Sequence, residues 1–227
     1  FKPSAKEIDL SEYELKFNEK VIQQAHVVKF LGMFVDEYLS WTLHVKNLSN
    51  KISKNLYLLR NAKNFLPDWS MRILYNSYIQ SHMTYGMMLW GPMCQVQHFN
   101  KLKKEQKKAI RVIGNSKYNA HTDPLFRKHK VLKVEELVKL ELTKFAFEIK
   151  SNSLPQPIQN LFNTGREYHN YNTRSRDNPL VNKHKSAVFN KSFLCRSPSI
   201  WSAASNHLKT SKTKGTLVSR FKKEIFP

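Results

Sequence analysis

The stretch "VKFLGMFVDEYLSWTLHVKNLSNKISKNLYLLR", residues 28–60, sets the fold, because the spacing of its apolar residues changes within it. Residues 27–35 are nearly all apolar and rich in Val and Phe, which predicts one central β-strand. From Ser40 onward, apolar residues recur every three or four positions, which is the pattern of an amphipathic helix. We therefore expect the chain to pass from strand to helix near Asp36.

Two adjacent carboxylates, Asp36 and Glu37, end the predicted strand. Paired carboxylates can hold divalent metal ions, but neighbouring strand residues point to opposite faces of a sheet. No second acidic strand end is evident. We therefore interpret Asp36 as the start of the turn into the helix and assign no catalytic residue, with a metal-dependent nuclease as an alternative. Cys94 and His98 supply two ligands where zinc takes four, so we assign no metal-binding residue.

The segments on either side of Asp36 extend this pattern. Residues 13–17 alternate apolar and polar side chains, and residues 21–22 begin a partner strand, so the N-terminus is expected to form a small antiparallel meander. Ser40 is a suitable cap for a helix that reaches about residue 63. Its inner stripe is expected to contain Val45, Leu48, Ile52, Leu56 and Leu59, and its outer side Lys46, Lys51 and Lys54.

Two further helices are expected. Residues 71–90 are apolar almost all round, which predicts a buried central helix with a possible break near residues 81–82. Residues 97–113 show the clearest amphipathic pattern. Their outer face is expected to carry four cations, Lys101, Lys104, Lys108 and Arg111.

The charge of the chain points to a polyanionic partner. The formal net charge is +21, from 38 Lys and Arg against 17 Asp and Glu, and most of the excess lies after residue 100. With so few acids we expect the lysines to be unable to pair internally, so phosphate contact is favoured over a merely solvated face. An anionic membrane surface is the second candidate. A membrane span is not expected, because the most apolar window contains Asn76, Gln80 and His82.

The C-terminal third is more polar. Residues 151–157 are expected to be a linker, and residues 163–186 a loop or partly disordered. Within the latter, "HNYNTRSR" supplies His169 and Tyr171 as stacking groups and Arg174 and Arg176 as phosphate ligands, which suits single strands or duplex ends. A polar loop folded against the domain explains the same residues. The two cysteines form no disulfide framework, which suits an intracellular compartment.

Several of these stretches together resemble the C-terminal part of a non-LTR (LINE-type) retrotransposon reverse transcriptase. They occur in the same order and cover nearly the whole chain. The matching segments are residues 28–60 quoted above, "FLPDWSMRILYNSYIQSHMTYGMMLWG" at 65–91, "LKKEQKKAIRVI" at 102–113, "AHTDPLF" at 120–126, "HNYNTR" at 169–174 and "PSIWSAASNHLK" at 198–209.

The resemblance implies a division of the chain. Residues 1–38 would be the end of the palm sheet, 39–150 the helical thumb and connecting helices, 151–186 a linker and basic loop, and 187–227 a small C-terminal unit. The strand residues Phe30, Leu31, Gly32 and Met33 resemble the primer grip, which positions the 3′ end of the primer.

The resemblance also implies partners and a location. The partners would be an RNA template, a DNA primer and the upstream fingers and palm of the same polyprotein, in the nucleus and cytoplasm. The palm aspartates, including the family's Ala-Asp-Asp turn, have no counterpart here. We therefore expect no cofactor in this chain, although Mg²⁺ is expected for the parent polymerase.

We therefore predict an α+β fold that is mainly α, with a small N-terminal antiparallel meander, a thumb-like helical bundle and a basic tail. The expected function is that of a nucleic-acid-binding fragment of an RNA-directed DNA polymerase, inactive on its own. Because the chain begins at Phe1 and not at Met, we expect it to be a piece of a longer protein. The alternative is a domesticated, non-catalytic RNA- or DNA-binding or scaffolding module.

Overall fold

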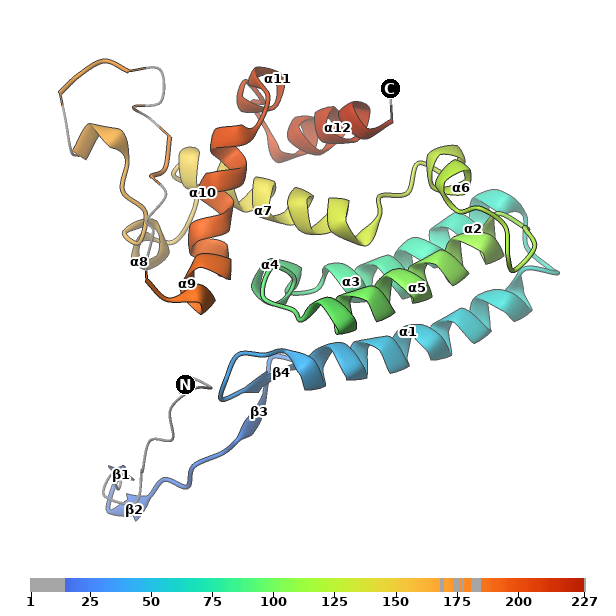
Figure 1. Ribbon diagram of the computed structural model, residues 1–227, viewed down its shortest axis with the longest axis horizontal. Coiled ribbons are helices and arrows are strands. Elements are labelled where there is room, and N and C mark those ends of the chain that lie inside the picture. The colour runs from blue at the N-terminus through green and yellow to red at the C-terminus, as the bar shows by residue number, and fades with distance from the viewer. Residues whose placement is uncertain (1–14, 168–169, 174–175, 177, 181–184, 227) are drawn as a thin grey trace.

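The computed structural model describes residues 15–167, 170–173, 176, 178–180 and 185–226. Most of these residues are helical, and the strands form two separate antiparallel sheets of two strands each. This confirms the predicted α+β, mainly α class. Figure 1 shows the helices gathered into one body, with the N-terminal strands extending away from it.

The strands form two hairpins and not a three-stranded meander. β1 (Lys16–Phe17) pairs with β2 (Lys20–Val21), and β3 (Val27–Phe30) pairs with β4 (Met33–Asp36). The prediction of one continuous strand over residues 27–35 is therefore wrong. Leu31 and Gly32 have φ angles of 46° and 80°, which is the left-handed pair that a two-residue hairpin turn requires.

Three helical segments follow the hairpins and form the bundle. α1 (Thr42–Ala62) and α5 (Val96–Ile113) pack against each other and run in the same direction (Figure 1). Between them in sequence lie α2 (Asp68–Tyr75), the π-helical turn η1 (Asn76–Gln80), α3 (Ser81–Thr84) and α4 (Met87–Trp90). The predicted inner stripe of α1 is confirmed, since all five of its residues are buried.

The segment predicted as one buried helix over residues 71–90 is more complex. It breaks at Gly86, which has a φ of 59°, and not near residues 81–82. It is also buried on one face only, because Ile73 and Tyr78 are exposed. The buried face follows a strict four-residue spacing, with Met71, Tyr75, Ile79 and Met83 all at 2% exposure or less.

The π-turn accounts for this spacing. In an α-helix with 3.6 residues per turn, positions four apart drift by about 40° at each step. The wider turn is closed by the Ser81 N–H, which donates to the carbonyl of Asn76 five residues earlier. Because such a turn takes roughly 4.4 residues, it brings the local average to about four and keeps the buried stripe on one face.

A buried glutamine joins the first helices to the next ones. The Gln106 side chain on α5 donates to the Tyr75 hydroxyl and to the Leu132 carbonyl, each at 2.9 Å, and accepts from the Val134 N–H at 3.0 Å. It thereby ties α2 and α5 to the start of α7 (Val134–Lys150), which follows the short α6 (Asp123–Lys128).

The C-terminal helices pack on α7. They are α8 (Gln156–Gln159), α9 (Ala187–Lys191), α10 (Phe193–Ala203), α11 (Asn206–Lys209) and α12 (Lys214–Ile225), with a 3₁₀ turn at Gly165–Glu167. Trp201 of α10 and Leu217 of α12 are fully buried in the core that also contains the α1 stripe.

Gly86 offers a test of how the hairpin is fixed to the bundle. A Cβ at this position would collide with Met33 Sδ, and the left-handed backbone disfavours any side chain. We expect Gly86→Ala to lower the free energy of unfolding by about 1–3 kcal/mol in urea titrations. As a control, Gly215→Ala on α12 meets only ordinary contacts, so it should be neutral or slightly stabilising. Equal effects of the two substitutions would contradict this account.

Candidate nucleic-acid interface

The tip of the β3–β4 hairpin presents two apolar side chains to solvent. Phe30 is 62% exposed and Leu31 69% exposed, whereas Met33 is buried against the bundle. The Tyr85 hydroxyl donates to the Leu31 carbonyl at 2.6 Å, which fixes the tip to the end of α3. The four predicted primer-grip residues therefore lie in one turn, and three of them, Phe30, Leu31 and Gly32, are at its outer end.

A small pocket of about 210 Å³ lies under this turn, between the hairpin, α1 and the end of α3. Its lining includes Lys29 and Gly32 from the hairpin and Lys51 from α1, together with His82 and Tyr85. The sequence analysis named Gly32 and Lys51 but missed the other three, because a hairpin turn at Leu31 was not expected. Two lysines beside an exposed apolar tip can hold one phosphate or sugar group of a strand that crosses the turn.

The histidines of this pocket are neutral bases at pH 7. Burial lowers the pKa of His44, whose ring lies between those of Trp41 and Trp90 at centroid distances of 6.1 and 5.8 Å. Burial, and then the positive charge of Lys51, lower the pKa of His82. The cationic charge of the pocket therefore comes from its lysines.

Asp36 acts as the turn residue that the sequence predicts. Its carboxylate accepts the backbone N–H groups of Tyr38, Ser40 and Trp41 at 2.9–3.1 Å, and also the Ser40 hydroxyl. These bonds hold Leu39 and Trp41 at positive φ angles. Because the turn extends through Trp41, α1 begins at Thr42 and Ser40 is not its N-cap, which corrects the expectation.

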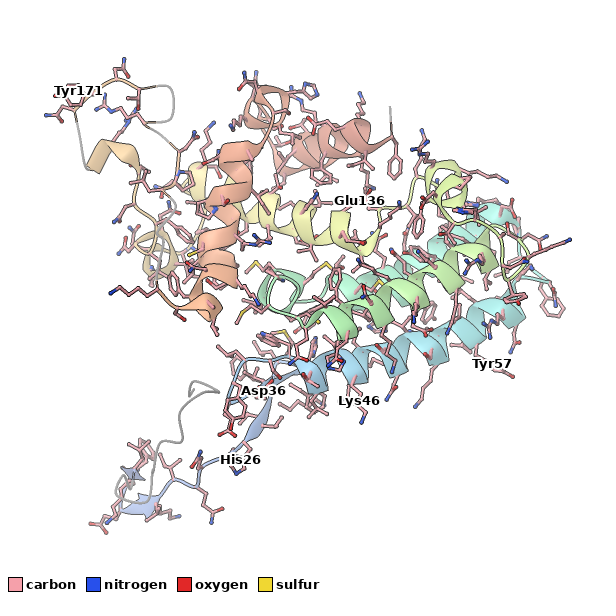
Figure 2. All side chains as sticks on the ribbon, viewed as in Figure 1. His26, Asp36, Lys46, Tyr57, Glu136 and Tyr171 are labelled. Atoms are coloured by element: carbon pink, nitrogen blue, oxygen red, sulfur yellow. The ribbon has the colours of Figure 1, made fainter. Side chains whose placement is uncertain are left out.

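Both oxygens of Asp36 are thus used by the turn, and Glu37 Oε1 lies 3.0 Å from His26 Nδ1. Figure 2 shows Asp36 and His26 at the base of the β3–β4 hairpin. These residues do not fit a magnesium site. Within the ranges that the structure describes, no three His, Cys, Asp or Glu side chains are grouped as around a metal ion.

The predicted lysines of α1 are all exposed, but they do not share one surface. Lys51 lines the hairpin pocket, whereas Lys46 and Tyr57 point away from the other helices (Figure 2). Lys54 lies one turn after Lys51. A strand leaving the pocket along α1 would meet Lys51 and Lys54 in succession.

The four predicted cations of α5 differ in their surroundings. Lys101 and Lys104 are exposed and form no ion pair in the described part of the chain. Lys108 lies 2.8 Å from Glu105, which is itself buried, and Arg111 donates from Nε to the Ala120 carbonyl at 2.9 Å. Two of the four are therefore already held by the protein.

The expectation that lysines cannot pair internally is therefore wrong. Each of these ion pairs joins a lysine to an acid on a helix or at its end: Lys103 with Glu135, Lys108 with Glu105, Lys133 with Asp123, Lys144 with Glu141 and Lys214 with Glu148. Two of the pairs are three residues apart in sequence, a spacing that could have revealed them.

The residues predicted from "HNYNTRSR" lie far from these helices. Tyr171 is 78% exposed and Arg176 is partly buried, while His169 and Arg174 lie outside the described residues. Figure 2 shows Tyr171 at the opposite end of the long axis from Tyr57. The structure does not bring this stretch to the hairpin or to the α5 lysines.

In the described part of the chain, none of the helices combines the length and the apolar composition needed to cross a bilayer.

Two transposon proteins of Drosophila melanogaster are similar to this chain. It is 22% identical over 133 residues to the probable RNA-directed DNA polymerase from transposon BS, an alignment that covers 57% of this chain and 15% of that protein. It is 24% identical over 120 residues to the probable RNA-directed DNA polymerase from transposon X-element, covering 51% and 13%. No protein-family model matches, and no solved structure matches.

The similarity is thus distant and partial, and this chain spans about one seventh of the length of these relatives. It supports the resemblance to transposon reverse transcriptases that the sequence motifs indicate. It leaves open which region of such a polymerase the chain corresponds to.

The Asp36 turn can be tested directly. Replacing Asp36 with Ala leaves three backbone N–H groups without their acceptor, so we expect the free energy of unfolding to fall by about 2 kcal/mol or more. Glu37→Ala removes an equal charge from the next position and should cost less. Urea denaturation of both variants measures the difference, and a larger loss for Glu37→Ala would refute the assignment.

The buried histidines predict a pH dependence of stability. Because the pKa of folded His44 lies below its unfolded value of about 6.5, the unfolded state binds more protons as the pH falls below that value. Stability should be complete above pH 6.5 and decline on acidification. His44→Phe should weaken this decline without abolishing it, since burial also lowers the pKa of His82 and His129. Thermal unfolding between pH 7.5 and 5 measures the effect; an unchanged profile would contradict it.

Proposed function

We propose that this chain is the nucleic-acid-binding C-terminal part of an RNA-directed DNA polymerase of the non-LTR retrotransposon kind, and that it contacts the RNA template and the DNA primer. The two polymerases to which it is similar support this assignment. So does the formal net charge of +21, which suits a phosphate backbone. The sheet and the first helices would act as the end of the palm and the thumb of the parent protein.

The observation that carries the proposal is a set of exposed lysines on α1 and α5 with no ion pair in the described part of the chain, namely Lys46, Lys51, Lys54, Lys101 and Lys104. Cations without a protein partner lose little on exchanging water for phosphate, and each contact releases counterions. The duplex would lie along these helices, with the primer end at the Phe30–Leu31 turn.

The polymerase chemistry would come from residues outside this chain. Nucleotide transfer needs carboxylates that hold paired metal ions, whereas the Asp36 carboxylate is committed to its turn. Mg²⁺ would therefore act in the palm of the parent polymerase. The nuclear and cytoplasmic location follows from the same assignment.

The salt dependence of binding tests this proposal. If Lys101 and Lys104 each contact one phosphate, the double variant Lys101→Ala, Lys104→Ala should reduce the slope of log K against log salt by about two. Anisotropy titrations with a labelled RNA–DNA hybrid at several salt concentrations give the slope for the whole chain.

The matched control removes the same charge from ion-paired lysines. Lys103 pairs with Glu135 at 2.6 Å and Lys144 with Glu141 at 2.8 Å, so their double alanine variant should change the slope much less. If both double variants shift the slope equally, general charge and not a defined lysine surface governs binding. If the wild-type chain fails to bind the hybrid, the proposed function is wrong.

A further inference from the structure

A second pocket lies at the far end of the bundle, where α1 and α5 both terminate. It has a volume of about 740 Å³, within the range of small-molecule sites. Arg60 and Lys63 line it from the end of α1, and Lys108 and Arg111 from the last turns of α5. The loop that follows α5 closes it with Tyr118. Because α1 and α5 run in the same direction, their two C-terminal ends meet at this pocket (Figure 1).

The pocket has a surplus of positive charge. It contains four cations, and none of the described residues that line it is acidic. Glu105 compensates Lys108 from outside the pocket. Two helix C-termini add a partial negative charge of about one unit in total, which favours cations there. That charge balances one of the three remaining cations, so the pocket still attracts an anion.

One of these cations is already oriented. Arg111 is partly buried, and its Nε donates to the Ala120 carbonyl at 2.9 Å. In the described part of the chain its two terminal amino groups make no hydrogen bond to the protein. A guanidinium held in this way loses little freedom on binding a phosphate through two parallel hydrogen bonds.

The aromatic ring at the rim is unusually exposed. Tyr118 is 89% exposed, although its loop is fixed by hydrogen bonds from the Ser116 N–H to the Arg111 carbonyl and from the Ala120 N–H to the Lys117 carbonyl. Packing therefore does not explain the ring. Phe65, next to the lining residue Asn64, is 85% exposed as well. Exposed aromatic rings beside cations are the usual platform for unpaired bases.

We propose that this pocket binds an unpaired nucleotide of a single-stranded RNA or DNA segment. Arg60, Lys63 and Arg111 hold its phosphate, and its base stacks on Tyr118. A base within a duplex cannot reach the ring, because both of its faces are covered by neighbouring bases. This inference rests on the proposed function and deepens it, since the exposed lysines of α1 and α5 would hold the duplex and this pocket an adjoining unpaired strand.

The experiment compares paired and unpaired ligands on the full 227-residue chain. Anisotropy titrations use a labelled single-stranded RNA, a single-stranded DNA of the same sequence and a blunt-ended RNA–DNA hybrid. Tyr118→Ala should weaken single-strand binding about fivefold or more and change hybrid binding less than twofold. Tyr118→Phe keeps the ring and should bind single strands like the wild type. Tyr57→Ala, an exposed tyrosine outside the pocket, should not reproduce the loss.

The outcomes separate the two proposals. A loss in the RNA or the DNA arm alone supports the pocket and identifies the strand that enters it. Equal losses for single strands and hybrid, or no loss for either, overturn the nucleotide site while leaving duplex binding by the lysines in place. A wild-type chain that binds none of the three ligands overturns the proposed function. Because Tyr118 is almost fully exposed, its variants should unfold at the wild-type temperature, and a lowered unfolding temperature for Tyr118→Ala would overturn the stacking role.

Discussion

The architecture depends on one buried amide, the side chain of Gln106. Its three hydrogen bonds join Tyr75, Leu132 and Val134, so one residue on α5 fixes both the middle of the bundle and the start of α7. Burial also raises the pKa of Tyr75, which stays a neutral donor and acceptor within this network. A buried polar group is costly unless it is satisfied, and here satisfaction requires the three segments to be in register. The helices α10 and α12 then pack on α7, whose start this network holds in place.

Two separate surfaces follow from this frame. The hairpin, held to the bundle through Tyr85 and Met33, gives one end of the molecule an apolar tip beside Lys29 and Lys51. The parallel course of α1 and α5 gives the other end a cationic pocket with Tyr118 at its rim. The exposed lysines of the two helices lie between these ends. Under the proposed function, one nucleic acid could contact both ends along a path about the length of α1, roughly 30 Å.

Much of this fold follows from the sequence, and the failures have physical causes. The α1 stripe and the role of Asp36 are predicted because spacing and local hydrogen bonding decide them. The turn at Leu31 and Gly32 is missed because a run of β-favouring residues surrounds it and only one glycine marks it. Gln106 is missed because a polar residue on an inner face looks like a boundary of that face. The candidate site is only partly predictable: side-chain charge gives the α5 lysines, but Tyr118 and Arg60 are brought together by tertiary packing alone.

The π-helical turn at Asn76–Gln80 has a consequence for how the length of this segment is constrained. A π-turn is equivalent to one residue inserted into an α-helix. Removing one residue there would let the segment relax to a regular helix and rotate everything beyond it by about 100°. Tyr85 and Gly86, which hold the hairpin tip, would turn away from it, although neither had been altered. The spacing between Met71 and Gly86 is therefore a conserved quantity of the fold in its own right, independent of which exposed side chains fill it.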